Sequence, residues 1–313
     1  MVRSSRFSIR GRQQYGARVC RFHRGTSSNL PLQATDLLVR SFRLVVHDGV
    51  RSHTPTEAIA ILPDLPVASV PSPRFSLVIP AYNEARLLPR LLDSVDVARK
   101  RFSSVRSAVE VIVADNVSTD TTAAIAAARG CRVVRVTARI IAAVRNAGGR
   151  EATGEILAFV DADSRIHPDT FSVIDQAMQS DRVVGGSTGC TLERWSPGLV
   201  ATFAAMLPVI WLTGIDTGVV FARRTEFTRL GGYDESYPAG EDVVWLWRLK
   251  RDGAARSRRL VRLRQIKVVA STRKFDQHGD WHYFRFVTAA PRFFLGGRKL
   301  TGFWDRYWYR PDR

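Results

Sequence analysis

A chain of 313 residues, 45% of them hydrophobic, is long enough to bury one sizeable core or two modest ones. Its 47 lysines and arginines outnumber its 29 acidic residues, and the net charge of +18 favours polyanions, phosphate-bearing substrates or an anionic membrane surface without choosing among them. Its three widely spaced cysteines, with no C-x-x-C pair, argue against a zinc site or a disulfide framework and suit a reducing compartment.

Residues 1–72 differ in composition from the rest of the chain. No acidic residue precedes Asp36, arginines are scattered among serines, and the stretch 62–73 is rich in proline. A secretory signal needs a continuous apolar stretch, and this segment has none. The composition resembles that of an organelle transit peptide, but no amphipathic period runs through it. We therefore expect a disordered basic extension, or a start codon assigned too far upstream, ahead of a folded domain over residues 73–313.

Alternating strands and helices are expected from residue 74 onward. Short apolar runs predict strands at 75–79, 109–114, 132–136 and 156–160. Pro89 suits the first turn of one helix, Ser118 can cap a second that ends at Ala128, and a third is expected around residues 144–153. This order predicts an α/β, Rossmann-like fold with a mostly parallel central sheet and helices on both faces. Ligands of such sheets bind beyond the carboxyl ends of the strands.

The most apolar stretch of the chain spans residues 199–215 and contains Pro208. It is short for a membrane span and is followed at once by Asp216. We expect a buried helix, or a helix lying on a membrane surface, rather than a transmembrane helix.

Four polar clusters lie at or near the predicted carboxyl edge of the sheet. They read PAYNE (80–84), DNVSTD (115–120), DAD (161–163) and GED (240–242). Asp161 and Asp163 follow a buried strand at alternate positions, so both carboxylates can point into one cleft. Two like charges so close are unfavourable unless a cation compensates them, and oxygen ligands of this kind suit Mg²⁺ or Mn²⁺. Taken alone, the triplet also fits an ordinary polar turn.

Longer motifs surround these clusters. They read FSLVIPAYNEARLLPRLLDSV, VIVADNVSTDTT, RNAGGREATGEILAFVDADS and GGYDESYPAGEDVVWLWRLKRDG. In order and spacing they resemble the family 2 glycosyltransferases of the GT-A fold. The resemblance covers roughly residues 74–253 and is followed by a region, expected to be helical, over 275–313. It implies an enzyme of hexosyltransferase type that takes its sugar from a nucleotide-diphosphate sugar and passes it to a lipid, a polysaccharide or a small molecule.

The resemblance also implies roles for individual residues. Those expected at the donor nucleotide are Pro80, Tyr82, Glu84, Asp115, Arg145, Asn146 and Asp161. Those expected at a divalent metal, Mn²⁺ or Mg²⁺, are Asp163 and Asp161, with His278 as a weaker candidate. Asp242 matches the base that takes the acceptor proton, and Asp216 and Glu241 fall on the acceptor side. One carboxylate that assists a single displacement implies inversion at the anomeric carbon.

The turn after the second predicted strand departs from the family pattern. Val117 and Thr121 stand where the family often has glycine. Such a turn often needs positive φ, so we expect its backbone to adapt beside the base pocket.

Two other classes of protein compete with this interpretation. A nucleotidyltransferase would carry a phosphate loop rich in glycine and arginine after the first strand, where this chain reads PAYNEARLL. A non-catalytic basic protein that binds a membrane or nucleic acid would carry charge without an organised acidic cleft. No specific nucleic acid is expected as a partner. The aromatic and basic residues from 281 onward favour packing on the domain first and a membrane surface second, so the expected location is cytoplasmic, with peripheral membrane association as the second expectation.

Overall fold

The computed structural model describes residues 72–102, 109–237 and 239–281. Its elements in chain order are β1 (Phe75–Ala81), α1 (Leu88–Phe102), β2 (Val109–Asp115), α2 (Thr122–Ala128), β3 (Arg132–Arg135), α3 (Ile141–Glu151), β4 (Ile156–Phe159), α4 (Thr170–Met178), β5 (Val183–Leu192), α5 (Pro197–Thr213), β6 (Val220–Arg223), α6 (Arg224–Leu230), α7 (Glu241–Ala255), β7 (Arg259–Ala270) and α8 (Arg273–His278). Nearly all of the expected extension 1–72, and most of the expected region 275–313, lie outside the described residues, so the domain division stays a prediction.

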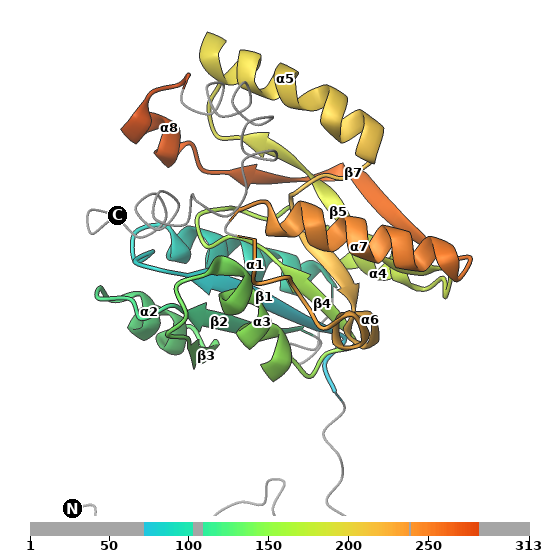
Figure 1. Ribbon diagram of the computed structural model, residues 1–313. Coiled ribbons are helices and arrows are strands. Elements are labelled where there is room, and N and C mark those ends of the chain that lie inside the picture. The colour runs from blue at the N-terminus through green and yellow to red at the C-terminus, as the bar shows by residue number, and fades with distance from the viewer. Residues whose placement is uncertain (1–71, 103–108, 238, 282–313) are drawn as a thin grey trace, which may run out of the picture. The chain divides into compact units, whose positions relative to one another are not determined.

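The strands form a seven-stranded sheet in the order β3-β2-β1-β4-β6-β5-β7 (Figure 1). β1 pairs in parallel with β2 and β4, and β2 pairs in parallel with β3. β6 runs antiparallel to both β4 and β5, and β7 is parallel to β5. The predicted α/β fold with a mostly parallel sheet is confirmed, with β6 as the reversed strand.

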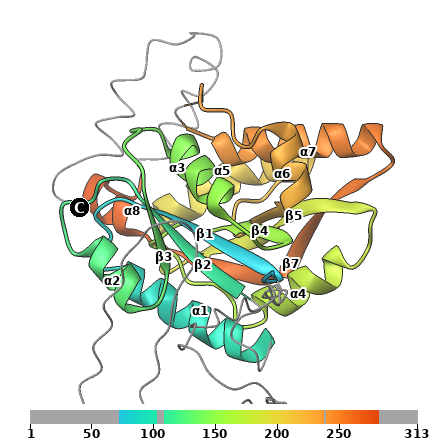
Figure 2. The same ribbon diagram turned by 90° about the horizontal axis from the view of Figure 1, so that it is seen from below.

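Both faces of the sheet are covered because its central strands are apolar on both sides. On β1, the alternate residues Phe75, Leu77 and Ile79 belong to a core that includes α1 and α4. Val78 points to the other face and belongs to a second core that includes Trp245 of α7. Figure 2 shows α1 and α4 on one side of the sheet and α3, α6 and α7 on the other. The predicted helices on both faces are therefore present.

The start of the second helix differs from the prediction. α2 begins at Thr122 rather than after Ser118. The carboxylate of Asp120 accepts a hydrogen bond from the backbone N–H of Thr122 at 2.9 Å. The hydroxyl of Ser118 instead accepts one from the backbone N–H of Asn83 at 3.0 Å. Ser118 therefore joins two turns of the chain, a tertiary contact that local capping preferences do not reveal.

The apolar stretch 199–215 is helical but is not buried along its length. Ser196 caps α5 by accepting a hydrogen bond from the Leu199 N–H at 3.3 Å, and Gly214 ends it in the left-handed conformation, with φ of 67°. Trp211 of this helix is 78% exposed, and Leu207 is 49% exposed. The expectation of a fully buried helix is thus wrong, while the membrane-surface alternative stays a prediction. Within the described ranges, no helix combines the length and apolar character needed to cross a membrane.

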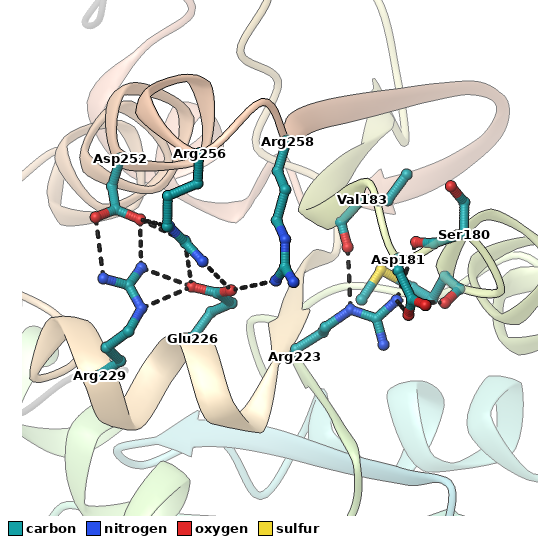
Figure 3. A network of polar contacts seen from close by, with 10 residues as sticks. Ser180, Asp181, Val183, Arg223, Glu226, Arg229, Asp252, Arg256 and Arg258 are labelled. Carbon is teal, nitrogen blue, oxygen red and sulfur yellow. Dashed lines mark hydrogen bonds and ion pairs between the residues drawn. The ribbon is translucent and has the colours of Figure 1, made fainter.

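A network of ion pairs joins α6, α7 and the start of β7 (Figure 3). Glu226, which is 3% exposed, accepts hydrogen bonds from Arg229, Arg256 and Arg258 at 2.6 to 3.1 Å. Asp252 of α7 pairs with the first two of these arginines. Burial opposes the charge of Glu226, but the hydrogen bonds from Arg256 and Arg229 lower its pKa below the ordinary value. The network therefore ties α6, the end of α7 and the start of β7 together through the carboxylate of Glu226.

We expect Glu226→Gln to lower the free energy of unfolding by about 1–3 kcal/mol at pH 7, because three arginines lose their shared buried partner. Urea denaturation would measure the change. The matched control is Asp181→Asn, since Asp181 is 97% exposed and lies 3.6 Å from Arg223 (Figure 3), so its loss should cost less than about 0.5 kcal/mol. The stabilisation is complete above the ordinary glutamate pKa and is lost as the pH falls through the lowered pKa of Glu226, so the two chains should converge in acid. Equal losses in the two variants at pH 7 would contradict the account.

Candidate functional site

A pocket opens at the carboxyl ends of β1 and β4, the edge where ligands were expected. Among the residues that line it are Pro80, Tyr82, Glu84, Asp161 and Asp163 from the predicted site, joined by Asn116, Arg273 and Lys274. The strands that carry the first set are parallel, so their ends meet at one edge of the sheet. Five of the predicted site residues are thus brought together by the fold.

The turn after β1 is held in place by the turn after β2. The backbone N–H of Glu84 donates to the hydroxyl of Thr122 at 2.8 Å, and the amide oxygen of Asn83 accepts from the backbone N–H of Thr119 at 2.8 Å. Asn83 and Val117 adopt φ of 52° and 57°. Positive φ is strained for a β-branched residue such as Val117, so the turn keeps the left-handed conformation that glycine often supplies in the family. The segment 118–122 therefore holds the turn that carries Glu84.

Arg273 of α8 links two of the predicted carboxylates. Its guanidinium donates to both carboxylate oxygens of Glu84, at 2.9 and 2.7 Å, and lies 3.4 Å from Oδ2 of Asp163. Burial, followed by the nearby charges of Asp161 and Glu84, raises the pKa of Asp163 to about 6. Arg273 and Lys274 oppose that rise. The pocket thus holds an excess of negative charge that these two cations only partly balance.

A buried arginine gathers a second set of carboxylates. Arg145 of α3, with a side chain that is 3% exposed, lies 2.7 Å from Asp161 and 3.0 Å from Asp242 and also pairs with Glu241. Although burial favours its neutral form, the carboxylates of Asp242 and Glu241 raise the pKa of Arg145 well above its ordinary value. α3 can approach the sheet because Gly148 faces it: a Cβ there would lie 2.4 Å from a methyl carbon of Val78. Arg145 thereby connects the turn after β4 to the first turn of α7.

Asp242 occupies an unusual environment at the start of α7. Burial, followed by the charges of Glu241 and Asp161, raises the pKa of Asp242 to about 7 against the opposing effect of Arg145. Its Oδ1 atom is buried and has no hydrogen-bond partner among the described residues. Arg145 and a hydrogen bond from the Tyr233 side chain favour the ionised form of this carboxylate. A carboxylate whose pKa lies near neutrality can exchange a proton close to pH 7, as a general base must.

Asn146 supports this arrangement rather than lining the pocket. Its amide nitrogen donates to the Tyr233 carbonyl at 2.9 Å, and its amide oxygen accepts from the Tyr233 N–H at 2.8 Å. These bonds hold the segment that leads to α7. The guanidinium of the preceding residue, Arg145, lies 5.6 Å from the centre of the Tyr233 ring. Asn146 therefore acts as a positioning residue for the segment before Asp242.

Three further predicted residues also lie outside the lining of the pocket. Asp115 is buried at the end of β2, where the backbone N–H of Ser118 lies 3.4 Å from its carboxylate oxygens, and its neighbour Asn116 lines the pocket instead. Asp216 pairs with Arg262 of β7 at 2.6 Å. His278 ends α8 and is not among the residues that line the pocket. Their expected roles as base contact, acceptor-side residue and metal ligand stay predictions.

No pattern in the sequence predicts the contact between Arg273 and Glu84. The two residues are 189 positions apart, and no local pattern links them. Only the return of the chain along β7 into α8 brings this arginine to the end of β1. A contact so distant along the chain depends on the sheet order, which local patterns do not specify.

Comparisons with known proteins identify the family that the chain resembles. Residues 76–219 match the family model described as glycosyl transferase family 2, which confirms the resemblance expected from the motifs. Validoxylamine A glucosyltransferase of Streptomyces hygroscopicus subsp. jinggangensis (strain 5008) is 25% identical over 240 residues, which cover 60% of this chain and 54% of that protein. The chain thus spans about half the length of this curated relative.

Solved structures share the fold. TarS 1–349 from S. aureus superposes with a TM-score of 0.51 and 17% identity, covering 74% of this chain and 68% of that one. Glucosyl-3-phosphoglycerate synthase from Mycobacterium tuberculosis, in complex with Mn²⁺, UDP-glucose and phosphoglyceric acid, superposes with a TM-score of 0.50 and 19% identity. The superposition covers 72% of this chain and 80% of that one. Similarity at these identities establishes a common GT-A fold.

We expect Asp242→Asn to raise the melting temperature at pH 8 in buffer containing a chelator. The native state keeps a proton that the unfolded chain releases near pH 4, so the stability of the wild type falls between about pH 4 and the pKa of about 7. The asparagine variant lacks this titration, so the difference in melting temperature between the variant and the wild type should shrink towards zero near pH 4. Melting curves over pH 4–8 would measure it, with exposed Asp181→Asn as the control. A variant less stable than the wild type at pH 8 would contradict the assigned environment of Asp242.

Proposed function

We propose that this chain, whose residues 76–219 match glycosyl transferase family 2, is an inverting, metal-assisted glycosyltransferase that moves a sugar from a nucleotide-diphosphate sugar to an acceptor hydroxyl. One observation carries the proposal. Arg145 binds both Asp161, at the mouth of the first pocket, and Asp242, the carboxylate suited to general base catalysis. Asp161 and Asp242 contact the same Nη2 atom of Arg145, which supports a leaving-group site and a proton-transfer site that are immediate neighbours.

The first pocket has the chemistry that a nucleoside diphosphate requires. Tyr82 and Pro80 offer apolar surface to a base or ribose, and Glu84 can accept hydrogen bonds from ribose hydroxyls. Arg273, which contacts Glu84, and Lys274 supply positive charge for phosphate oxygens in the same pocket. UDP is the first nucleotide to test, since TarS and the mycobacterial synthase have been crystallised with UDP-sugars.

The charges of the pocket fit a divalent cation. The raised pKa of Asp163 reflects burial beside Asp161 and Glu84, which is the electrostatic environment that a bound cation relieves. In the part of the chain that the structure describes, no three His, Cys, Asp or Glu side chains are arranged so that they alone could hold a metal ion. Asp163 and Asp161 would therefore hold the ion together with water and phosphate oxygens, as Mg²⁺ and Mn²⁺ sites at nucleotides commonly do. The metal would supply charge neutralisation for the departing diphosphate.

Proton transfer would fall to Asp242. In its ionised form it accepts the acceptor's hydroxyl proton while that oxygen approaches the anomeric carbon opposite the leaving diphosphate, so the configuration at that carbon inverts. Arg145 keeps the carboxylate in place at 3.0 Å and limits the rise of its pKa. Glu241 beside it pairs with the same arginine, so it is a positioning residue in this scheme.

We expect one nucleoside diphosphate, from a panel of UDP, GDP, CDP, ADP and TDP, to raise the melting temperature only when Mn²⁺ is present. Ligand that binds the folded state alone stabilises it, and a hundredfold excess over Kd contributes about 2.7 kcal/mol. Asp163→Asn should abolish the shift, whereas the control Asp181→Asn should retain it. If a well-folded sample responds to none of the nucleotides, the proposal fails and a non-catalytic basic protein becomes the better account.

We expect Asp242→Asn to keep this nucleotide-dependent shift while its turnover falls at least about 100-fold, the usual contribution of a general base. Release of the nucleoside diphosphate from sugars linked to the nucleotide that the panel identifies would measure turnover. In the wild type, turnover should rise with pH through about 7, where Asp242 ionises. Full activity of the asparagine variant would exclude Asp242 as the base.

A further inference from the structure

A second pocket lies between α5 and the strands β5 and β7, which are neighbours in the sheet (Figure 1). One wall is apolar and aromatic and consists of α5 residues that include Phe203, Leu207 and Trp211. The opposite wall is basic and includes Arg264 and Lys267 of β7. The pocket therefore offers two different surfaces to one ligand.

The basic wall has positive charge that the described residues do not neutralise. Arg262 pairs with Asp216 at 2.6 Å, so its charge is balanced. Arg264 and Lys267 are exposed, and neither has an ion-pair or hydrogen-bond partner for its side chain among the described residues. Two such cations beside an apolar wall complement a ligand that has an anionic group joined to an apolar chain.

The second pocket lies near the acidic residues of the first pocket. Arg165, two residues after Asp163, exchanges both backbone hydrogen bonds with Val269 at 2.9 Å, and Val269 lies two residues after Lys267 on β7. Cys190 lines the second pocket. Burial, followed by the negative charges of Asp216, Asp161 and Asp163, raises the pKa of its thiol to about 12. The turn that carries Asp161 and Asp163 is therefore bonded to β7 two residues beyond Lys267 of the second pocket.

We infer that the second pocket binds the acceptor and that the acceptor is a phosphorylated amphiphile, with its phosphate at Arg264 and Lys267 and its apolar chain along α5. This inference rests on the proposed function and specifies its acceptor. A hydroxyl of the amphiphile forms the new bond to the anomeric carbon and gives its proton to Asp242. The bond from that carbon to the diphosphate oxygen breaks, and the nucleoside diphosphate leaves with the electron pair. The exposed Trp211 marks the wall along which the chain lies.

Titration of the full chain with dodecyl phosphate, below its micelle concentration, tests this assignment by calorimetry and by tryptophan fluorescence. We expect saturable binding with a blue shift of emission, because the ligand covers Trp211, and loss of that shift in Trp211→Phe. Dodecanol and inorganic phosphate, which each lack one half of the ligand, should bind at least about tenfold more weakly. The double variant Arg264→Gln/Lys267→Gln should weaken dodecyl phosphate binding by a similar factor, whereas Arg259→Gln, an exposed arginine at the other end of the same strand, should not.

Several outcomes would overturn the inference. Inorganic phosphate that binds as tightly as dodecyl phosphate would show that the apolar wall is not used. Dodecanol that binds as tightly, or a double variant that binds normally, would show that the cations are not used. If light scattering shows that the chain self-associates, and the associated form does not bind dodecyl phosphate, the apolar wall would be assigned to a second copy of the chain.

The nucleotide shift with Mn²⁺, measured on the same sample, separates the two proposals. A chain that binds the nucleotide but not the amphiphile contradicts the acceptor assignment alone. A chain that binds the amphiphile but no nucleotide supports the ligand chemistry of the second pocket and contradicts the glycosyltransferase proposal.

Discussion

The buried guanidinium of Arg145 is the interaction on which the arrangement of the site depends. It pairs with Asp161, Glu241 and Asp242, which come from segments about 80 residues apart along the chain. Without a cation between them, three carboxylates in a largely buried space would repel one another and take up protons. The close approach of α3 to the sheet at Gly148 puts this cation where the carboxylates converge.

The site is nevertheless not neutralised by the protein's own groups. The pKa of Asp163 rises to about 6 and that of Asp242 to about 7, although arginines lie close to both. Folding therefore holds two carboxylates in surroundings that favour their protonated forms, which costs stability near neutral pH. Such strain is common where a site must bind a cation or accept a proton. The charge of Asp161 contributes to the raised pKa of both carboxylates, so the two are linked electrostatically through this residue.

The topology of the sheet divides the two pockets. The parallel strands β1 and β4 present the first pocket at their carboxyl ends, as in other open α/β sheets. The reversed strand β6 allows β5 and β7 to extend the sheet beyond β4, and α5 then covers the outer part of these two strands. Backbone bonds between Arg165 and Val269 join the two regions. The turn that carries Asp161 and Asp163 is thus bonded to the strand that forms the basic wall of the second pocket.

The amino-acid sequence by itself determined the α/β fold, the positions of the first four of the seven strands and the identity of the main acidic residues, because apolar periodicity and the order of the motifs are local properties. It could not determine that Asn116 rather than Asp115 lines the pocket, that Ser118 bonds to Asn83, or that α5 leaves Trp211 exposed. It gave no sign of the pairing between Arg273 and Glu84, which requires β7 and α8 to return to the start of the sheet. These features were decided by tertiary structure, because they depend on contacts between segments whose separation in sequence carries no information about their distance in space.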